Sequence, residues 1–156
     1  MGAAGTASAA VERRAAYEAG VAALDPTAPG RIELGDFSVE WGRAAVDRIW
    51  PSRPDALICA NDLIAAGALQ RLRQLGADVP GEVAVTGFDD IPLAGLADPA
   101  LTTVRQPVGE LAAEAARLLT HRPSAGAPGP RSTVRLAPQL VVRASSAPVV
   151  GAPSAH

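Results

Sequence analysis

The stretch CANDLIAAGALQRLRQLGADVPGEVAVTGFDD, residues 59–90, decides the predicted fold. Two apolar segments, Ala56–Ala60 and Val83–Phe88, each end on a polar pair within this stretch. The first pair is Asn61-Asp62 and the second is Asp89-Asp90. Short apolar runs that are bounded by polar and turn residues are typical of strands buried on both faces of a sheet. The two polar pairs are therefore predicted to follow two strands of one sheet.

A helix is predicted between these two strands. The segment Asp62–Leu75 carries Leu69, Leu72 and Leu75 on neighbouring faces, and Gly76 suits the left-handed position just after a helix. A helix that joins two apolar strands is the pattern of a βαβ unit, in which the two strands run parallel.

The same alternation of helix and strand extends over most of the chain, and it predicts an α/β protein with a doubly wound parallel sheet. The predicted helices are Ala9–Leu24 with Ser8 as cap, Val39–Trp50 with Ser38 as cap, Asp62–Leu75 and Val108–Leu119. The predicted strands are Arg31–Leu34, Ala56–Ala60, Val83–Phe88, an extended segment Thr102–Gln106 and one strand within Val134–Arg143.

Three parts of the chain depart from this alternation. A helix precedes the first strand, so the first βα unit is expected to be truncated. His121–Pro130 is rich in Pro, Gly and Ser and is expected to be an exposed loop. The tail from Ala144 has no periodicity and is expected to be disordered.

The composition excludes several classes of protein. The 156 residues suffice for one domain or two small lobes, and 48% of them are hydrophobic. A net charge of −2 favours neither nucleic-acid binding nor a basic membrane surface. No apolar run reaches the roughly 20 residues of a membrane helix, and the start has no signal-peptide pattern, so we predict a cytoplasmic protein without membrane contact.

The polar residues at the strand ends are the candidate binding residues. In open α/β sheets, ligands bind in the crevice at the carboxyl ends of the strands, where Asn61 and Asp89 lie. An amide and a carboxylate together can hold vicinal hydroxyls of a sugar or ribose. Phe37, beyond the first strand, could offer a ring an apolar face, and Arg13 could hydrogen-bond hydroxyls or a carboxylate.

Each of these residues also has a purely structural interpretation. Asn61 or Asp62 could only cap the following helix. Asp89 and Asp90 could only open a turn. Phe37 could belong to the core and Arg13 to a solvated helix face. The binding interpretation depends on all four candidates meeting at one edge of one sheet.

Enzyme chemistry has little support in the sequence. The motifs G-x-S-x-G, G-x-G-x-x-G and H-E-x-x-H are missing, and the absence of lysine excludes a P-loop lysine and a Schiff base. His121 and His156 lie in a Pro-rich loop and at the last position, so no metal site is expected. Cys59 is interpreted as a small buried hydrophobic residue.

The chain resembles the LacI/GalR (lactose-repressor/galactose-repressor) family of bacterial transcription regulators. The resemblance rests on PDALICANDLIAAGALQRLRQLGADVPGEVAVTGFDD, PALTTVRQP and LAPQLVVRAS in this order, and more weakly on ERRAAY and GDFS. It implies a periplasmic-binding-protein-like effector domain, in which a small ligand lies between two lobes and shifts how a dimer holds its operator.

The resemblance also implies a division of the chain. Residues 1–100 would form the C-terminal lobe, 101–133 a crossover with one helix and a loop of an incomplete N-terminal lobe, 134–143 the return strand, and 144–156 a disordered tail. By motif, Arg13 matches the ligand arginine of the family and Phe37 its stacking aromatic residue. Asn61 and Asp89 match the polar pair that holds hydroxyls, and Tyr17 matches a neighbouring aromatic position.

Partners follow from the same resemblance. The effector would be a sugar, polyol or nucleoside, and no cofactor is implied. A homodimer would form through the C-terminal lobe, with Leu63, Leu69, Leu93 and Leu96 as interface as well as core. Operator DNA would be bound only by a helix-turn-helix head that this sequence does not contain, so this chain alone is not expected to bind an operator. Ala16 stands where the family usually has glycine.

The sequence also allows other functional interpretations. The chain could be a truncated remnant without ligand binding, because half of the cleft would be missing. It could be a sugar-processing α/β enzyme that uses Asp89 as a base, or a secreted solute-binding protein of the same fold, although the missing signal sequence counts against the latter.

Overall fold

A computed structural model of the chain describes residues 2–3, 8–24, 27, 30–120 and 133–146. In chain order the elements are β1 (Gly2–Ala3), α1 (Ser8–Leu24), β2 (Leu34–Gly35), α2 (Val39–Ile49), the 3₁₀ turn η1 (Trp50–Ser52), β3 (Ala56–Ile58), α3 (Asp62–Gln74), β4 (Ala84–Thr86), α4 (Pro92–Leu96), β5 (Thr103–Arg105), α5 (Val108–Thr120) and β6 (Gln139–Val141). Among the described residues, no helix is long and apolar enough to cross a membrane.

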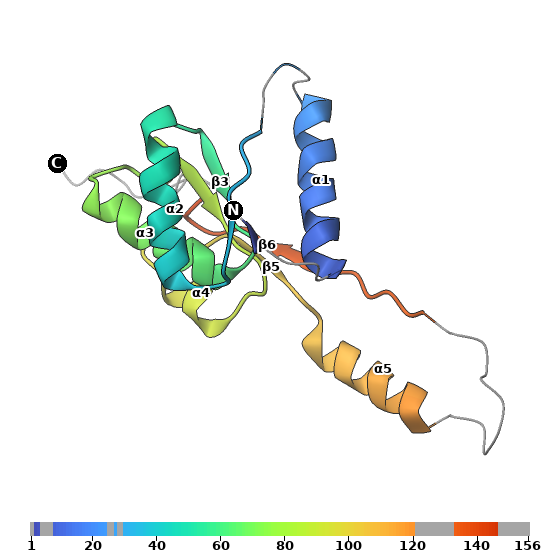
Figure 1. The fold of residues 1–156 in the computed structure, drawn as a ribbon. Helices are drawn as coiled ribbons and strands as arrows, with labels where there is room; N and C mark the ends of the chain where they lie inside the picture. Colours follow the sequence, from blue (N-terminus) through green and yellow to red (C-terminus); the bar gives the residue numbers. More distant parts are fainter. Residues whose placement is uncertain (1, 4–7, 25–26, 28–29, 121–132, 147–156) are drawn as a thin grey trace.

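Parallel strands form the centre of the molecule. β3 pairs in parallel with β4, with Leu57 opposite Val85, and β5 pairs antiparallel with β6. Parallel bridges from Thr86 to Thr102 and from Asp89 to Arg105 join β4 to the β5 segment. The strands β3, β4, β5 and β6 therefore lie side by side in this order, and the predicted α/β class is confirmed (Figure 1).

The core lies between this sheet and the helices α2 and α3. Its largest fully buried apolar side chains are Val46, Ile64, Leu72, Val83, Val85 and Leu101. Two glycines let the helices approach closely: a Cβ at Gly42 would overlap the Ile64 carbonyl oxygen, and one at Gly67 would overlap the Val39 carbonyl oxygen. The α2–α3 contact therefore depends on small residues at the crossing point.

Two predicted capping residues are found where they were expected, one at the start of α2 and one after the end of α3. The Ser38 hydroxyl accepts a hydrogen bond from the Trp41 amide at 3.1 Å, as expected for the cap of α2. Gly76 follows α3 with φ of 72°, a left-handed conformation that glycine adopts without steric cost. Both sequence predictions are confirmed.

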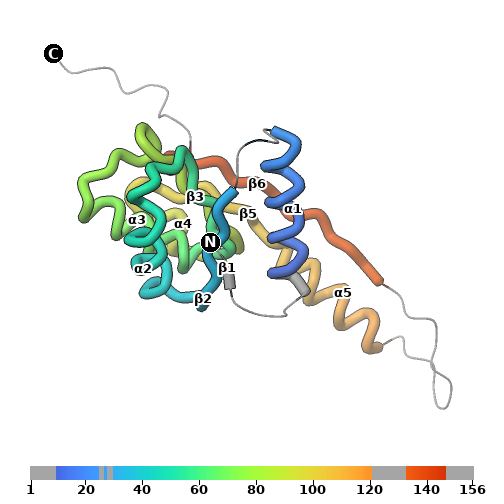
Figure 2. Tube along the Cα trace, turned by 45° about the horizontal axis from the view of Figure 1, so that its top comes forward, coloured from blue at the N-terminus to red at the C-terminus, as the bar shows by residue number. Residues whose placement is uncertain are grey.

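Two helices, α1 and α5, lie outside the core formed by α2, α3 and the sheet. Figures 1 and 2 show α1 beside the sheet and α5 projecting away from it. No residue of α5 is buried, although Val108, Leu111, Leu118 and Leu119 give it an apolar face. An amphipathic helix normally buries such a face, so α5 has no packing partner among the described residues.

Three sequence predictions need correction. The first strand was expected at Arg31–Leu34, but β2 is Leu34–Gly35. The chain was expected to open on a helix, but a two-residue β1 precedes α1 and pairs in parallel with β2, so α1 is the helix of a short βαβ unit. The third correction concerns the tail, because Ser145 is fully buried.

The first three residues of the predicted tail, 144–146, lie against the sheet. The Val85 amide donates to the Ser145 carbonyl oxygen at 2.8 Å, and the Ser145 hydroxyl donates to the Val85 carbonyl oxygen at 2.6 Å. Residues 144–146 are therefore anchored beside β4, contrary to the predicted disordered tail. Residues 147–156 and the predicted loop His121–Pro130 lie outside the described residues.

Candidate functional site

The ends of β3 and β4 meet at one edge of the sheet. The Asp62 amide donates to the Phe88 carbonyl oxygen at 2.9 Å, and the Cys59 amide donates to that of Thr86 at 2.9 Å. The parallel pairing thus continues past both strands and ends with Asn61 close to Asp89. This edge is where an open α/β sheet binds its ligands.

Arg13 reaches this edge from α1. Its Nη1 donates to the Ala60 carbonyl oxygen at 2.8 Å, and its guanidinium lies 4.4 Å from the centroid of the Phe88 ring. The arginine therefore bridges the residues that directly precede Asn61 and Asp89. It is half-buried, so the interpretation of Arg13 as a merely solvated helix residue does not fit its position.

Asn61 has a structural role and a free polar group. Its Oδ1 accepts a hydrogen bond from the Ile64 amide at 2.9 Å, which caps α3. Its Nδ2 forms no hydrogen bond within the described part of the chain, although the residue is only 9% exposed. The amide donors of Asn61 are therefore the groups that a ligand could use.

Asp89 is held in an unusual backbone conformation. Its φ is 111°, and that of Asp90 is 55°, in a region that residues with a Cβ rarely adopt. Its Oδ1 accepts a hydrogen bond from Gln106 Nε2 at 2.6 Å. The second carboxylate oxygen is engaged by no other described residue and can accept from a hydroxyl.

The two aromatic candidates lie further out. Phe37 is 39% exposed between β2 and the cap of α2, so it is not a core residue. Tyr17 lies one helical turn after Arg13 and packs on Gly30, where a Cβ would come within 2.6 Å of the tyrosine hydroxyl. The structure thus places Arg13 against the residues that directly precede Asn61 and Asp89, and it shows no contact of Phe37 or Tyr17 with these three residues among the interactions of the described part of the chain.

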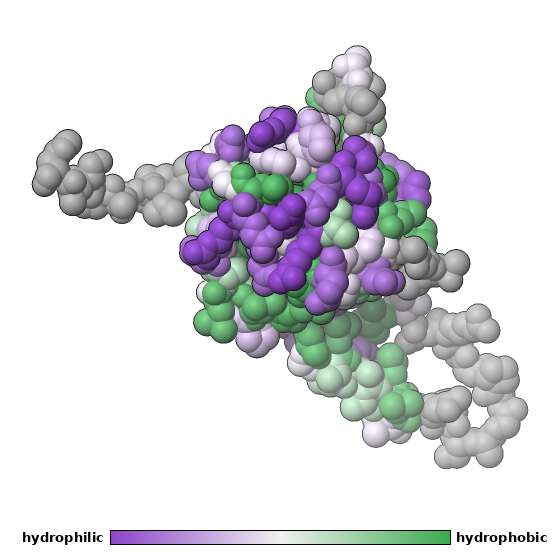
Figure 3. Space-filling view, turned by 60° about the vertical axis from the view of Figure 1, so that its left-hand side comes forward, coloured by the Kyte–Doolittle hydropathy of each residue, from purple (hydrophilic) through white to green (hydrophobic). Residues whose placement is uncertain are grey.

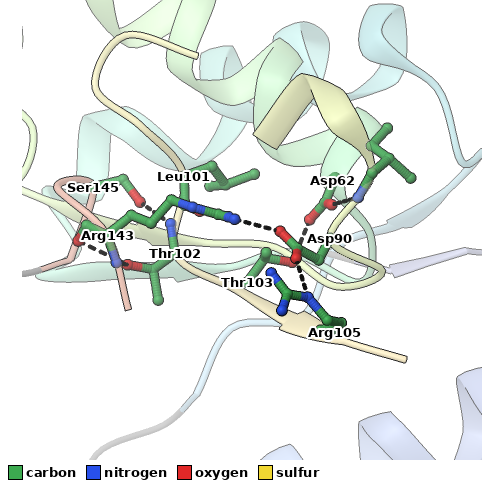
Figure 4. A network of polar contacts seen from close by, with 9 residues as sticks. Asp62, Asp90, Leu101, Thr102, Thr103, Arg105, Arg143 and Ser145 are labelled. Carbon is green, nitrogen blue, oxygen red and sulfur yellow. Dashed lines mark hydrogen bonds and ion pairs between the residues drawn. The ribbon is translucent and has the colours of Figure 1, made fainter. Parts of the chain in front are cut away.

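A polar network behind this edge was missed at the sequence level (Figure 4). Its members hold the β5 and β6 segments to the ends of β3 and β4. They are Asp62, Asp90, Thr102, Thr103, Arg105, Arg143 and Ser145. All of them lie in the three quoted motifs, so the motif positions were the available signal, but nothing in the sequence pattern showed which residues would pair.

Two carboxylates of this network have opposite pKa shifts. Burial raises the pKa of the Asp62 carboxyl, and hydrogen bonds from the Thr103 hydroxyl and the Ile91 amide offset this only in part. Burial also acts on Asp90, but hydrogen bonds from Arg143 and Arg105 outweigh it and hold the pKa of that carboxyl below its ordinary value. Asp90 is therefore ionised at neutral pH.

The site is suited to binding rather than to covalent chemistry. It offers guanidinium and amide donors beside a carboxylate acceptor, which is a set for hydroxyl groups. The nearest thiol, Cys59, is buried, and burial raises its pKa to about 12, so it is not a thiolate nucleophile at neutral pH.

Comparison with known proteins fixes the family. Residues 2–146 match the model of the periplasmic binding protein-like domain. The chain is 44% identical over 115 residues to the HTH-type transcriptional regulator MalR of Streptomyces coelicolor. The structure of a sugar-binding transcriptional regulator of the LacI family from Escherichia coli, complexed with phosphate, superposes with a TM-score of 0.79 over 92% of this chain at 30% identity. The chain belongs to the LacI family of transcriptional regulators.

A further solved relative within this family carries a sugar. The CelR–cellobiose complex superposes with a TM-score of 0.77 over 88% of the chain at 36% identity. The chain spans only part of these LacI-family proteins: 74% of it matches 33% of MalR, and it covers 52% and 42% of the two solved chains. The resemblance stated from the motifs is thus confirmed, as is the periplasmic-binding-protein-like fold. These relatives are regulators and not enzymes.

The four leucines assigned to a LacI-type dimer interface divide into two groups. Leu69 is 5% exposed and belongs to the core, whereas Leu63, Leu93 and Leu96 are exposed on α3 and α4. Figure 3 shows the side of the molecule that lies on the left in Figure 1, with hydrophilic residues gathered across its middle and hydrophobic residues along its lower border. Only the three exposed leucines are available to a second chain.

Proposed function

We propose that the chain is the ligand-sensing and dimerising part of a LacI-type transcription regulator. Its effector is a small polyhydroxylated molecule of the sugar, polyol or nucleoside class, bound at the ends of β3 and β4. The observation that carries the proposal is the position of Arg13, whose guanidinium contacts Ala60 beside Asn61 and Phe88 beside Asp89.

Each residue of this site has a distinct part in the proposal. The Arg13 guanidinium and the Asn61 amide donate to ligand oxygens, and the Asp89 carboxylate accepts from ligand hydroxyls. Phe37 and Tyr17 supply apolar faces for a sugar or base ring. The cellobiose bound to the relative CelR supports the sugar class.

The same proposal assigns the chain to two lobes. Residues 1–100 and 134–143 belong to the C-terminal lobe, and 101–133 cross to an N-terminal lobe that includes α5. The exposed apolar face of α5 supports this division, because the helix projects from the body that contains the strand ends (Figure 1). The return segment extends to Ser146, which donates to the Thr102 hydroxyl at 2.7 Å.

Ligand binding is tested by the thermal midpoint of the chain in millimolar cellobiose, D-ribose and adenosine. Binding to the folded chain raises the midpoint in proportion to RT ln(1 + [L]/Kd). At least one of these probes should raise it, and Asp89→Asn or Arg13→Gln should abolish the rise. Asp98→Asn is the matched control, because the Asp98 side chain is 87% exposed and lies outside the site.

The alternatives make different predictions in this experiment. A remnant without ligand binding shows no midpoint shift with any of the three probes. A shift that survives both Asp89→Asn and Arg13→Gln would place the ligand elsewhere and overturn the proposed site.

Dimerisation is proposed through the exposed apolar residues of α3 and α4. Leu96 is 82% exposed, and with Leu63 and Leu93 it forms an apolar surface that a second copy of the chain would cover. Sedimentation velocity should show a dimer that Leu96→Asp converts to monomer. Leu119→Asp, on the exposed face of α5, is the control; loss of the dimer by this variant instead would move the interface to α5.

Operator binding is assigned to the helix-turn-helix head of the longer relatives. The net charge of −2 does not favour binding of this chain to the polyanion DNA. Fluorescence anisotropy with labelled duplex DNA should therefore detect no sequence-specific complex at micromolar chain concentrations. A specific complex at nanomolar concentrations would refute this division of roles.

A further inference from the structure

Asp90 binds two arginines that come from different segments. Its Oδ2 accepts from Arg105 Nε at 2.6 Å, and its Oδ1 accepts from Arg143 Nη2 at 2.6 Å. The Asp90 side chain is only 6% exposed, so both ion pairs are shielded from water on the carboxylate side. Each oxygen of one buried carboxylate thus holds a different part of the chain.

Each arginine lies on one of the two crossing segments, which are residues 101–106 before α5 and the described residues 133–146 after it. Arg105 is the last residue of β5, and Arg143 follows β6 by two positions. Arg143 also donates from Nη1 to the Leu101 carbonyl oxygen at 2.8 Å, and its amide donates to the Thr102 hydroxyl at 2.8 Å. Figure 4 shows Asp90 between the two arginine side chains.

Asp90 adjoins Asp89 in a backbone turn that needs external support. Both residues have positive φ, 111° and 55°, and such conformations persist only where surrounding contacts fix them. The contacts around this turn are the two Asp90 ion pairs, the hydrogen bond from Gln106 to the Asp89 side chain, and the hydrogen bond from the Asp89 amide to the Val104 carbonyl oxygen at 2.9 Å. Asp89 is thus bonded to the β5 segment alone, whereas Asp90 is bonded to both crossing segments.

Asp62 repeats this arrangement at the end of β3. It directly follows Asn61, accepts from the Thr103 hydroxyl at 2.5 Å and accepts from the Ile91 amide at 2.9 Å. A Cβ at Gly87 would overlap Asp62 Oδ1, so the glycine leaves room for this buried carboxyl. However, Asp62 contacts only β5 of the two crossing segments, whereas Asp90 contacts both.

We propose that Asp90 is a positioning residue that holds both crossing segments to the end of β4, next to Asp89. The hydrogen bonds of the two segments therefore break together and not independently. Its regulatory meaning rests on the proposed function: an effector bound by Asp89 acts on both crossings through one neighbouring side chain. Arg105 and Arg143 are coupled through this carboxylate and not only through the β5–β6 ladder.

The test is amide hydrogen exchange of the ligand-free chain, followed by NMR. The reporters are the amides of Thr102, Arg143 and Ser145, which donate to Ser145 Oγ, Thr102 Oγ1 and the Ala100 carbonyl oxygen. Asp90→Asn should accelerate exchange at all three by about tenfold, because the amide has no charge and only one acceptor oxygen, so both ion pairs are lost and only one arginine can still donate to it. Amides in the middle of α3 should not change, and Asp98→Asn is the control for removal of one carboxylate.

A second variant tests whether the two crossing segments are coupled through Asp90 or are only destabilised in general. Arg105→Gln should accelerate exchange at Arg143 and Ser145 about fivefold when Asp90 is present, and should have no further effect in the Asp90→Asn chain. An equal effect of Arg105→Gln in both backgrounds would mean that the strand ladder carries the coupling, and the proposal would be overturned. Acceleration of only one segment by Asp90→Asn would overturn it as well.

If Asp90→Asn does not fold, Arg143→Gln replaces it. This variant should accelerate exchange at Thr103–Arg105 although Arg105 itself is unchanged, and unaltered exchange there would refute the coupling. Because no ligand is present, these outcomes do not depend on the effector. If the exchange results are as expected but cellobiose, ribose and adenosine cause no midpoint shift, the positioning role of Asp90 is supported and the proposed ligand function is not.

Discussion

Helices α3 and α5 have the same length, 13 residues each, but opposite environments. Both carry leucines at helical spacing, and both were predicted from that spacing. Eight residues of α3 are buried, whereas no residue of α5 is. The difference shows that helical periodicity predicts an apolar face but not the element that covers it. The apolar face of α3 is covered by α2 and the sheet, whereas that of α5 has no partner among the described residues.

The largest effect that separates the two helices is expected from leucine truncation. Leu72 is fully buried in α3, so Leu72→Ala should lower the free energy of unfolding by about 2–5 kcal/mol through lost contacts and a cavity. Leu118→Ala on α5 removes the same atoms from a 37% exposed position and should cost less than about 0.5 kcal/mol. Urea denaturation of both variants gives the comparison. A similar loss for both would show that α5 is covered in solution.

The next largest effect concerns the glycines of the two helices. A Cβ at Gly67 in α3 would overlap the Val39 carbonyl oxygen, so Gly67→Ala should destabilise the chain by about 1–3 kcal/mol. A Cβ at Gly109 in α5 would meet nothing within 4 Å, so Gly109→Ala should be neutral or stabilising by up to about 1 kcal/mol. Urea midpoints that fall equally would contradict the close α2–α3 crossing.

The sequence predicted the parts of the fold that depend on local pattern. The four predicted helices, α1, α2, α3 and α5, were placed to within about one residue of their ends, because caps such as Ser38 and Gly76 act on neighbouring backbone groups. The strand before α2 was misplaced, because only two of its residues pair. The burial of Ser145 was missed because its hydrogen bonds go to Val85 and Thr102, far away in the sequence.

The candidate site divides in the same way. Asn61 and Asp89 could be predicted because each directly follows an apolar strand, and the rule for strand ends applies to any open α/β sheet. Asp90 stands next to Asp89 and looked equivalent to it in the sequence. The proposed positioning role of Asp90 depends on its ion pairs with Arg105 and Arg143, which lie 15 and 53 positions further along the chain. A local sequence pattern does not predict pairs between residues so far apart.

A smaller effect distinguishes the beginnings of the two helices. α3 starts at the side-chain cap Asn61, whereas α5 starts after Pro107. Asn61→Ala should lower the free energy of unfolding by about 1 kcal/mol, and Asn61→Ser, which retains a capping oxygen, should lower it by a few tenths. Both variants lack the amide donors proposed to bind the effector. Equal stability of Asn61→Ala and the unchanged chain in urea would show that the cap contributes nothing.

The smallest effect is a pH dependence at the first residue of α3. Burial raises the pKa of Asp62 in the folded chain, so the unfolded chain releases this proton first as the pH rises. Between the two pKa values the folded chain binds more protons, and stability falls with rising pH. The stability of Asp62→Asn relative to the unchanged chain should therefore improve from about pH 4 upward and level off above the folded pKa of Asp62.

The difference between the two chains at each pH isolates this carboxyl. Asp90 and Glu33 have lowered pKa values, so they act in the opposite direction, but they are present in both chains and cancel. Asparagine can accept from the Ile91 amide through Oδ1 and donate to the Thr103 hydroxyl through Nδ2, so the two hydrogen bonds are preserved in number. Glu110→Gln in the exposed first turn of α5 is the matched control. A difference curve for Asp62→Asn that is flat from pH 4 to pH 8 would mean that Asp62 is not a buried carboxyl in solution, and the contrast between the two helix starts would disappear.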